Sequence, residues 1–137
     1  MAIVYRVNHT ISLKEFIQVL ESSTLAPRRP MEDPACLQGM LDEANLTITA
    51  WQDQHLVGIA RCVTDFHYCC YVSDLAVDAQ LQGQGVGKKL LDLCVEHTRD
   101  TCKIILLASP AANGYYPKIG MHHMDRCWIL NPNERPN

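Results

Sequence analysis

The sequence predicts an α/β fold built on a largely antiparallel sheet. Strand-like and helix-like patterns alternate along the chain, and short turns join the early strands. In addition, a glycine-rich turn links an apolar strand at residues 71–77 to a helical pattern that follows it. No linker, repeat or low-complexity segment interrupts the 137 residues, so we expect a single domain over residues 1–137.

Local patterns place the individual elements. Ser12 fits a helix N-cap, and Glu15 completes a capping box for a helix that continues to about residue 20. Prolines at 27, 30 and 34 break the next segment into a loop before a second helix. The other expected helices are 34–43, 85–98 and 111–119, and the expected strands are 3–7, 46–51, 56–64, 68–77 and 104–108, with a final extended pair at 122–124 and 127–130.

Composition argues against several classes of protein. A net charge of -3 with scattered basic residues gives no support to nucleic-acid binding. No apolar run approaches the roughly 20 residues that span a membrane, and the first residues lack the features of a secretory signal. The seven cysteines follow no zinc-ligand spacing. We therefore expect a cytoplasmic protein with no metal, no membrane partner and mostly buried, reduced thiols.

The turn at residues 82–88 is the most informative segment of the chain. Its glycines let the backbone approach a ligand closely, and the free amides of a helix start point toward an anion. The Walker pattern fails because Lys89 stands where a hydroxyl residue is required. The dinucleotide pattern fails because Gly83, Gly85 and Gly87 recur at every second position. The turn therefore predicts a phosphate-bearing ligand of another kind.

Two motifs in register resemble one family. Gln82, Gly85 and Gly87 match the Gln/Arg-x-x-Gly-x-Gly/Ala loop of the GCN5-related N-acetyltransferases (GNAT). Residues 112–121 are similar to the late helix of that family, which usually ends in Tyr-x-Lys-x-Gly-Phe, and the apolar strand at 104–108 separates the two motifs as it does in the family. The resemblance implies a small, single-domain member whose mixed sheet is flanked by helices and has splayed central strands.

The resemblance also implies an activity. A GNAT protein of this size would move an acetyl group from acetyl-CoA to a primary amine by direct transfer, with a small-molecule amine as the favoured acceptor. Three alternatives stay open: a non-catalytic module that binds acyl-CoA as a sensor, transfer to a protein amine, and transfer of a longer acyl group. A homodimer through the C-terminal strands would also suit the family.

The family's cofactor contacts map onto two segments of this sequence. The pantetheine arm would lie between the splayed strands and bond backbone groups of Leu75, Ala76 and Val77. Asn113 and Tyr116 of the late helix would complete the cofactor site. Amides of the turn would hold the pyrophosphate, and the residues assigned to this role are Gln82, Gly83, Gln84, Gly85, Val86, Gly87 and Lys88. The charge of Lys88 either adds to that site or is simply solvated.

Tyr116 occupies the family's general-acid position, where a phenol protonates the departing thiolate. A phenol with the ordinary pKa of about 10 carries its proton at neutral pH. Tyr115 is the rival, since a shift of one residue would exchange the two phenols. Pro117 removes a backbone donor, so we expect it to kink or end the late helix.

Three charged residues are candidates on the acceptor side. Asp74 lies in an apolar strand, where an unpaired charge is costly, so it needs a partner or a function. It would take a proton from the amine through water, hold a cationic substrate, or bond nearby backbone or an arginine. Arg28 and Arg29 lie in the loop that borders the acceptor pocket in the family. They would select an acceptor with a carboxylate or phosphate, or else face solvent.

Overall fold

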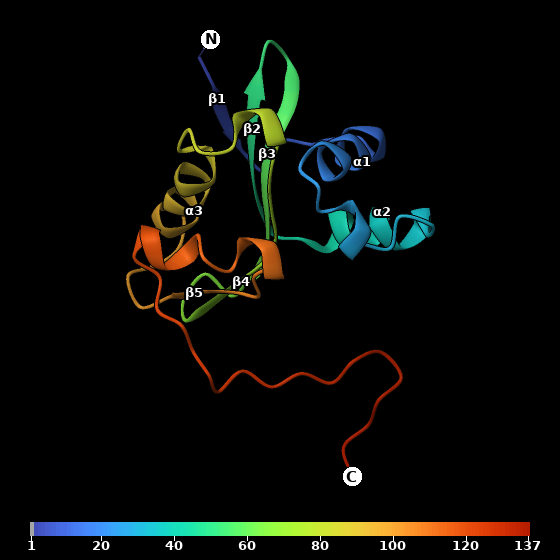
Figure 1. Ribbon diagram of the computed structural model, residues 1–137, viewed down its shortest axis with the longest axis vertical. Helices are drawn as coiled ribbons and strands as arrows, with labels where there is room; N and C mark the ends of the chain where they lie inside the picture. The colour runs from blue at the N-terminus through green and yellow to red at the C-terminus, as the bar shows by residue number, and fades with distance from the viewer. Residues whose placement is uncertain (1) are drawn as a thin grey trace. The chain divides into compact units, whose positions relative to one another are not determined.

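The computed structural model describes residues 2–137, which divide into two compact units, one ending at Leu107 and the other beginning at Ala108. The first unit contains a five-stranded sheet with the strand order β1-β2-β3-β4-β5 (Figure 1). Neighbouring strands are antiparallel except β4 and β5, which are parallel. The predicted α/β class and largely antiparallel sheet are confirmed.

The observed elements lie close to the expected ranges. The strands are β1 (Val4–Val7), β2 (Leu46–Gln52), β3 (His55–Thr64), β4 (Cys69–Val77) and β5 (Lys103–Leu106), and the helices are α1 (Leu13–Ser22), α2 (Pro34–Glu43) and α3 (Val86–Glu96). None of the helices among the described residues is long and apolar enough to cross a bilayer.

Local chemistry explains where the first elements begin and turn. The Ser12 hydroxyl accepts a hydrogen bond from the Glu15 amide at 3.0 Å, and the Glu15 carboxylate accepts one from the Ser12 amide at 2.9 Å. This capping box satisfies two amides at the start of α1, as predicted. Asp53 and Gln54 have φ values of 50° and 68°, the left-handed conformation that a tight two-residue hairpin between β2 and β3 requires.

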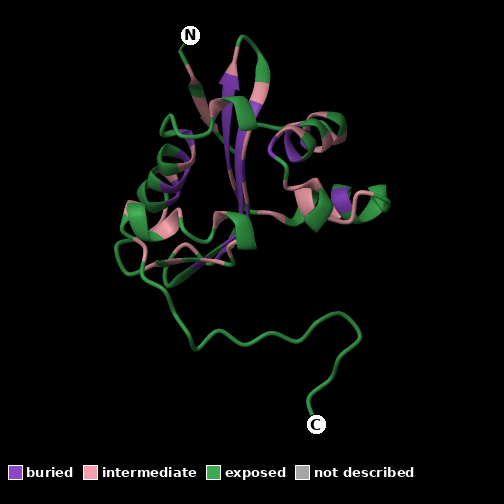
Figure 2. Cartoon of the chain, viewed as in Figure 1, coloured by how far each residue is buried: buried purple, intermediate pink, exposed green. Residues whose placement is uncertain are grey.

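Helices cover both faces of the sheet (Figure 1): α1 and α2 lie on one face and α3 on the other. Buried residues are concentrated in the central strands and on the inward sides of these helices (Figure 2). On the face of α1 and α2, one apolar cluster consists of Phe16, Val19, Leu20, Leu37, Ile59 and Ala76.

On the opposite face, α3 packs closely on β3 at Gly58. A Cβ atom on Gly58 would lie 3.3 Å from side-chain atoms of Ala50, Val86 and Leu90. Glycine at this position therefore allows α3 to approach the sheet, and Val86 anchors the helix start in the core. This packing fixes the position of the glycine turn relative to β4.

The second unit, Ala108–Asn137, differs from the sequence prediction. The expected helix at 111–119 is replaced by two short 3-10 turns, η3 (Pro110–Ala112) and η4 (Tyr116–Ile119). Pro117 lies in the first turn of η4, where its missing amide is tolerated, but it cannot continue an earlier helix.

The expected extended pair at 122–124 and 127–130 is also wrong, since the described part of the chain has no strand after β5. Strand formation requires a paired backbone, and residues 121–137 donate only two backbone hydrogen bonds, from Met121 to Tyr116 and from Glu134 to Asn131, besides one from Asn131 to the Glu134 carboxylate. The apolar residues that suggested a strand are exposed, and Trp128 is 91% exposed.

The cysteines are less buried than predicted. Cys62, Cys70 and Cys94 are buried, but three others are exposed and one is partly exposed: Cys36, Cys69, Cys127 and Cys102. All seven are free thiols. The prediction rested on the usual burial of free cysteines, but the adjacent pair 69–70 alternates across β4 and buries only one member.

We predict that Gly58→Val destabilises the fold by about 1–3 kcal/mol, because the new methyl groups would push α3 away from the sheet. Urea unfolding followed by circular dichroism measures the change. Gly39→Val is the matched control, since a Cβ at Gly39 meets no atom within 4 Å. Equal stability of the two variants would contradict the close packing of α3 on β3.

Candidate active site

β4 and β5 separate halfway along β4. Cys69 to Val72 pair with Lys103 to Leu106, whereas residues 73–77 have no partner on that side among the described residues. On its other side, β4 stays paired with β3 as far as Val77. The predicted splay of the central strands is therefore confirmed. An unpaired strand edge presents backbone donors and acceptors that an extended ligand can bond.

The glycine turn follows directly after this open stretch of β4. Gly83 and Gly85 have φ values of 80° and 87°, a left-handed conformation that strains any residue with a side chain. The Gln82 side-chain amide donates to the Val77 carbonyl at 3.1 Å and so ties the turn to the end of β4. The turn and the open edge are thus held in one arrangement.

The N-terminus of α3 provides donors for an anion. The first hydrogen bond of the helix runs from the Lys89 amide to the Gly85 carbonyl at 3.0 Å. The amides of residues 86–88 precede this bond and have no acceptor within the helix. Together with the partial positive charge of the helix end, they suit a phosphate group. Lys88 is exposed on the first turn.

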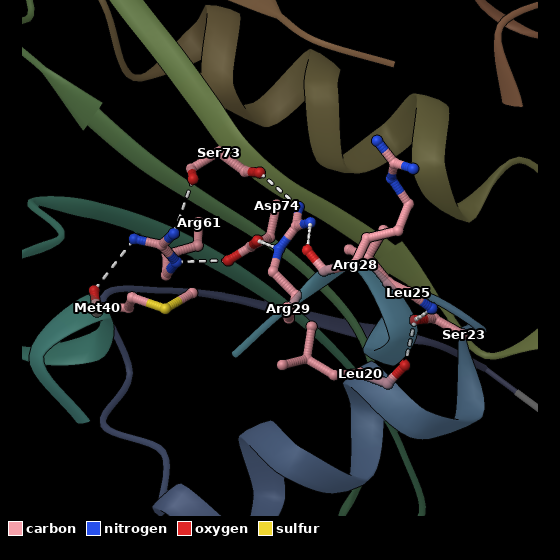
Figure 3. Close-up of polar contacts among 9 residues, drawn as sticks. All are labelled: Leu20, Ser23, Leu25, Arg28, Arg29, Met40, Arg61, Ser73 and Asp74. Atoms are coloured by element: carbon pink, nitrogen blue, oxygen red, sulfur yellow. Dashed lines mark hydrogen bonds and ion pairs between the residues drawn. The ribbon is translucent and has the colours of Figure 1, made fainter. Parts of the chain in front are cut away.

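Asp74 lies in the middle of β4 and is fully buried (Figure 3). One carboxylate oxygen accepts from Arg29 Nε and the other from Arg61 Nε, each at 2.5 Å. Of the three roles expected for Asp74, the contacts fit the bond to an arginine, since one arginine lies on each carboxylate oxygen. A carboxylate in this arrangement is charge-paired on both sides.

The two arginines extend this cluster to the neighbouring backbone. Arg29 donates to the carbonyls of Arg28 at 2.8 Å and Ser73 at 2.9 Å. Arg61 donates to the Met40 carbonyl at 3.1 Å and to the Ser73 hydroxyl at 2.8 Å. The cluster therefore joins β3, β4, the end of α2 and the turn η1 (Ala26–Arg28).

An irregularity in the sheet accompanies the cluster. Arg61 pairs with Asp74 across the β3–β4 ladder, whereas the next residue, Cys62, pairs with Val72. This shift leaves Ser73 without an opposite residue, as in a β-bulge, and bulges commonly re-aim side chains near functional sites. Ser73 uses both its hydroxyl and its carbonyl to bind the two arginines.

The structure brings Arg29 and Asp74 together but leaves Arg28 outside the cluster. Arg61 was missed in the sequence prediction, although a signal was present: it is the one charged residue within the apolar run of residues 56–63. A charge in such a strand needs a partner, and the hairpin connection places Asp74 on the adjacent strand.

Tyr115 and Tyr116 belong to the second unit. Their rings meet edge to face with centroids 5.3 Å apart. Burial, and secondarily the neighbouring Tyr115 phenol, raise the pKa of Tyr116 above its ordinary value. The Tyr116 phenol is therefore protonated throughout the neutral range. Asn113, the other predicted cofactor residue of this unit, is exposed.

Known proteins share this fold. The sequence model of the acetyltransferase (GNAT) family matches residues 13–121. The chain therefore belongs to the GNAT family, as the two motifs predicted. A predicted acetyltransferase from Clostridium acetobutylicum, solved with acetyl-CoA, superposes with a TM-score of 0.67 at 18% identity, covering 95% of this chain and 96% of that one.

Two relatives are similar in sequence. The chain is 29% identical to an uncharacterized N-acetyltransferase, ycf52-like, from Prochlorococcus marinus, over 90% of this chain and 66% of that protein. It is 38% identical over 52 residues to glucosamine 6-phosphate N-acetyltransferase 1 from Oryza sativa subsp. japonica, which covers 36% of this chain and 32% of the relative. The chain thus spans less than two thirds of either relative's length.

No group of three metal-binding side chains is arranged around an ion site among residues 2–137.

We predict that Asp74→Asn destabilises the protein by about 3–5 kcal/mol, because the substitution removes the carboxylate that pairs with both Arg29 and Arg61. Urea unfolding measures the loss. Asp53→Asn makes the same charge change at an exposed turn residue and should alter stability by less than about 0.5 kcal/mol. Equal effects of the two substitutions would show that the cluster does not stabilise the fold.

Proposed function

We propose that this protein transfers an acetyl group from acetyl-CoA to a primary amine of a small molecule, by direct transfer between the two bound substrates. The observation that carries the proposal is the open stretch of β4 at residues 73–77, followed at once by a glycine turn and a helix N-terminus. Free thiols at all seven cysteines support a reducing, cytoplasmic setting.

The residues of the first unit fit acetyl-CoA. We assign Leu75, Ala76 and Val77 to the pantetheine arm, which needs backbone partners along an extended path. The Val77 carbonyl at the end of this stretch accepts a hydrogen bond from the Gln82 side chain. The amides of the turn and of the first residues of α3 suit the pyrophosphate, and Lys88 lies exposed beside them. The bound thioester supplies the acetyl group.

We assign the proton for the leaving thiolate to the Tyr116 phenol, on the resemblance of its motif to the family's late helix. The raised pKa of Tyr116 keeps this phenol protonated, which a general acid requires before transfer. Asn113 is assigned to the cofactor on the same resemblance.

We propose a positioning role for Asp74 in place of proton transfer. A general base needs an oxygen within hydrogen-bond reach of the amine or of a bridging water. Both oxygens of Asp74 instead accept from arginines, and the side chain is fully buried. The acceptor amine would then enter in its neutral form from solution, and the proton that its nitrogen loses on acylation would pass to solvent, from which the Tyr116 phenolate regains its own.

We predict that Tyr116→Phe lowers kcat by about 10²-fold or more, because the thiolate would leave without a proton. Coenzyme A release from a panel of amines, including glucosamine 6-phosphate, measures turnover, and calorimetry measures acetyl-CoA affinity, which should change little. Tyr115→Phe is the matched control. A larger loss in that variant would assign the acid to Tyr115 instead.

Two outcomes would overturn the wider proposal. Acetyl-CoA binding without release from any amine would favour a sensor module. Failure to bind acetyl-CoA would contradict both readings, since both depend on the same turn and strand edge.

We predict that Gly85→Ala weakens acetyl-CoA binding up to about tenfold. The left-handed conformation costs a residue with a Cβ about 1–2 kcal/mol, which lowers the population of the binding-competent turn. Gly39→Ala, whose Cβ meets open space without a positive φ, is the control and should bind normally. Unchanged affinity in Gly85→Ala would remove the turn from the cofactor site.

A further inference from the structure

We propose that Arg28 determines acceptor specificity by binding an anionic group, a carboxylate or a phosphate, on the amine substrate. This inference rests on the proposed acetyl transfer and names the chemical class of its acceptor. Its basis is the different environments of two adjacent arginines: Arg29 binds Asp74 in the cluster, whereas Arg28 is exposed and lies outside it.

Arg28 lies beside the open stretch of β4. Arg29 reaches across to β4, where it binds Asp74 and the Ser73 carbonyl. These contacts hold η1 beside the point where the open stretch of β4 begins. The open stretch begins at the end of β4 that lies away from the pyrophosphate turn, so the thioester end of a pantetheine arm bound along β4 would lie there. Arg28 is therefore near the point where an acceptor amine must approach.

The backbone that carries Arg28 is held by hydrogen bonds on both sides. Arg29 Nη1 donates to the Arg28 carbonyl at 2.8 Å, and the Arg28 amide donates to the Leu25 carbonyl at 3.0 Å. Pro27 fixes one backbone torsion within the same turn. The backbone of Arg28 is thus fixed at both of its polar groups, so a ligand would have to order only the side chain and not the loop that carries it.

The region around Arg28 carries excess positive charge. The Arg28 side chain is exposed and extends away from Asp74, Arg29 and Arg61 (Figure 3). Its guanidinium forms no ion pair or hydrogen bond with any residue in the described part of the chain. The neighbouring cluster has two guanidiniums for one carboxylate, so it also carries excess positive charge. This region attracts anionic acceptors and disfavours polycations.

Matched acceptors test the inference. The kcat/KM values of wild type, Arg28→Gln, Arg28→Lys and Arg99→Gln are compared on O-phosphoethanolamine against ethanolamine, and on tyrosine against tyramine. We expect wild type to prefer the anionic member of at least one pair, and Arg28→Gln to lose that preference by about tenfold through KM. Arg28→Lys should recover part of it. Arg99→Gln removes the same charge from an exposed site and should match wild type.

Acetyl-CoA affinity, measured on each variant, separates this inference from the proposed function. Arg28→Gln should bind acetyl-CoA normally. Equal rates on the anionic and neutral members, or a preference that Arg28→Gln leaves intact, would overturn the role of Arg28 while acetyl transfer stands. If no amine is acetylated, the transfer proposal fails. In that case, ligand-observed NMR tests whether O-phosphoethanolamine binds to the protein through Arg28. Binding signals of equal strength in wild type and Arg28→Gln would overturn the proposed anion site.

Discussion

A buried carboxylate between two guanidiniums is the interaction on which the arrangement of the site depends. Asp74 contacts Arg61 of β3 and Arg29 of the turn after α1, and Arg61 in turn binds a carbonyl near the end of α2. Arg61 is buried and Arg29 is partly buried, and neither could lie there without Asp74, because an unpaired charge in an apolar sheet is far costlier than a paired one. The same pairing fixes η1 against β4, so an ion pair in the core determines which loop lies beside the open stretch of this strand.

The second constraint is the shortness of β5 relative to β4. β5 ends at Leu106, opposite Val72, so among residues 2–137 the rest of β4 has a strand partner only in β3. An open edge inside a sheet is unfavourable unless something bonds it. Here the edge leads into a turn whose glycines adopt a left-handed conformation and whose helix amides face outward. One extended ligand with an anionic end would satisfy both features, and for this reason the strand edge and the turn are best understood as one site.

Much of this could be predicted from the sequence, because short-range rules govern it. The capping box of α1, the hairpin at Asp53 and the glycine turn are each encoded within a few residues. The pairing of Arg61 with Asp74 depends on strand register, which local patterns do not specify. The prediction of a strand in the C-terminal segment was wrong for a related reason. Residues 127–130 have the apolar composition of a strand, but a strand also needs a pairing partner, which composition does not reveal.

The adjacency of Arg28 and Arg29 shows how one buried acid can separate the roles of two identical residues. If Asp74 had a single partner, a second arginine nearby could share its charge, and neither would be free for a ligand. With Arg61 on one oxygen and Arg29 on the other, the carboxylate has no capacity left for Arg28. The buried pair therefore does more than neutralise a strand. It leaves the neighbouring guanidinium with its full charge, on a backbone that the cluster itself holds in place.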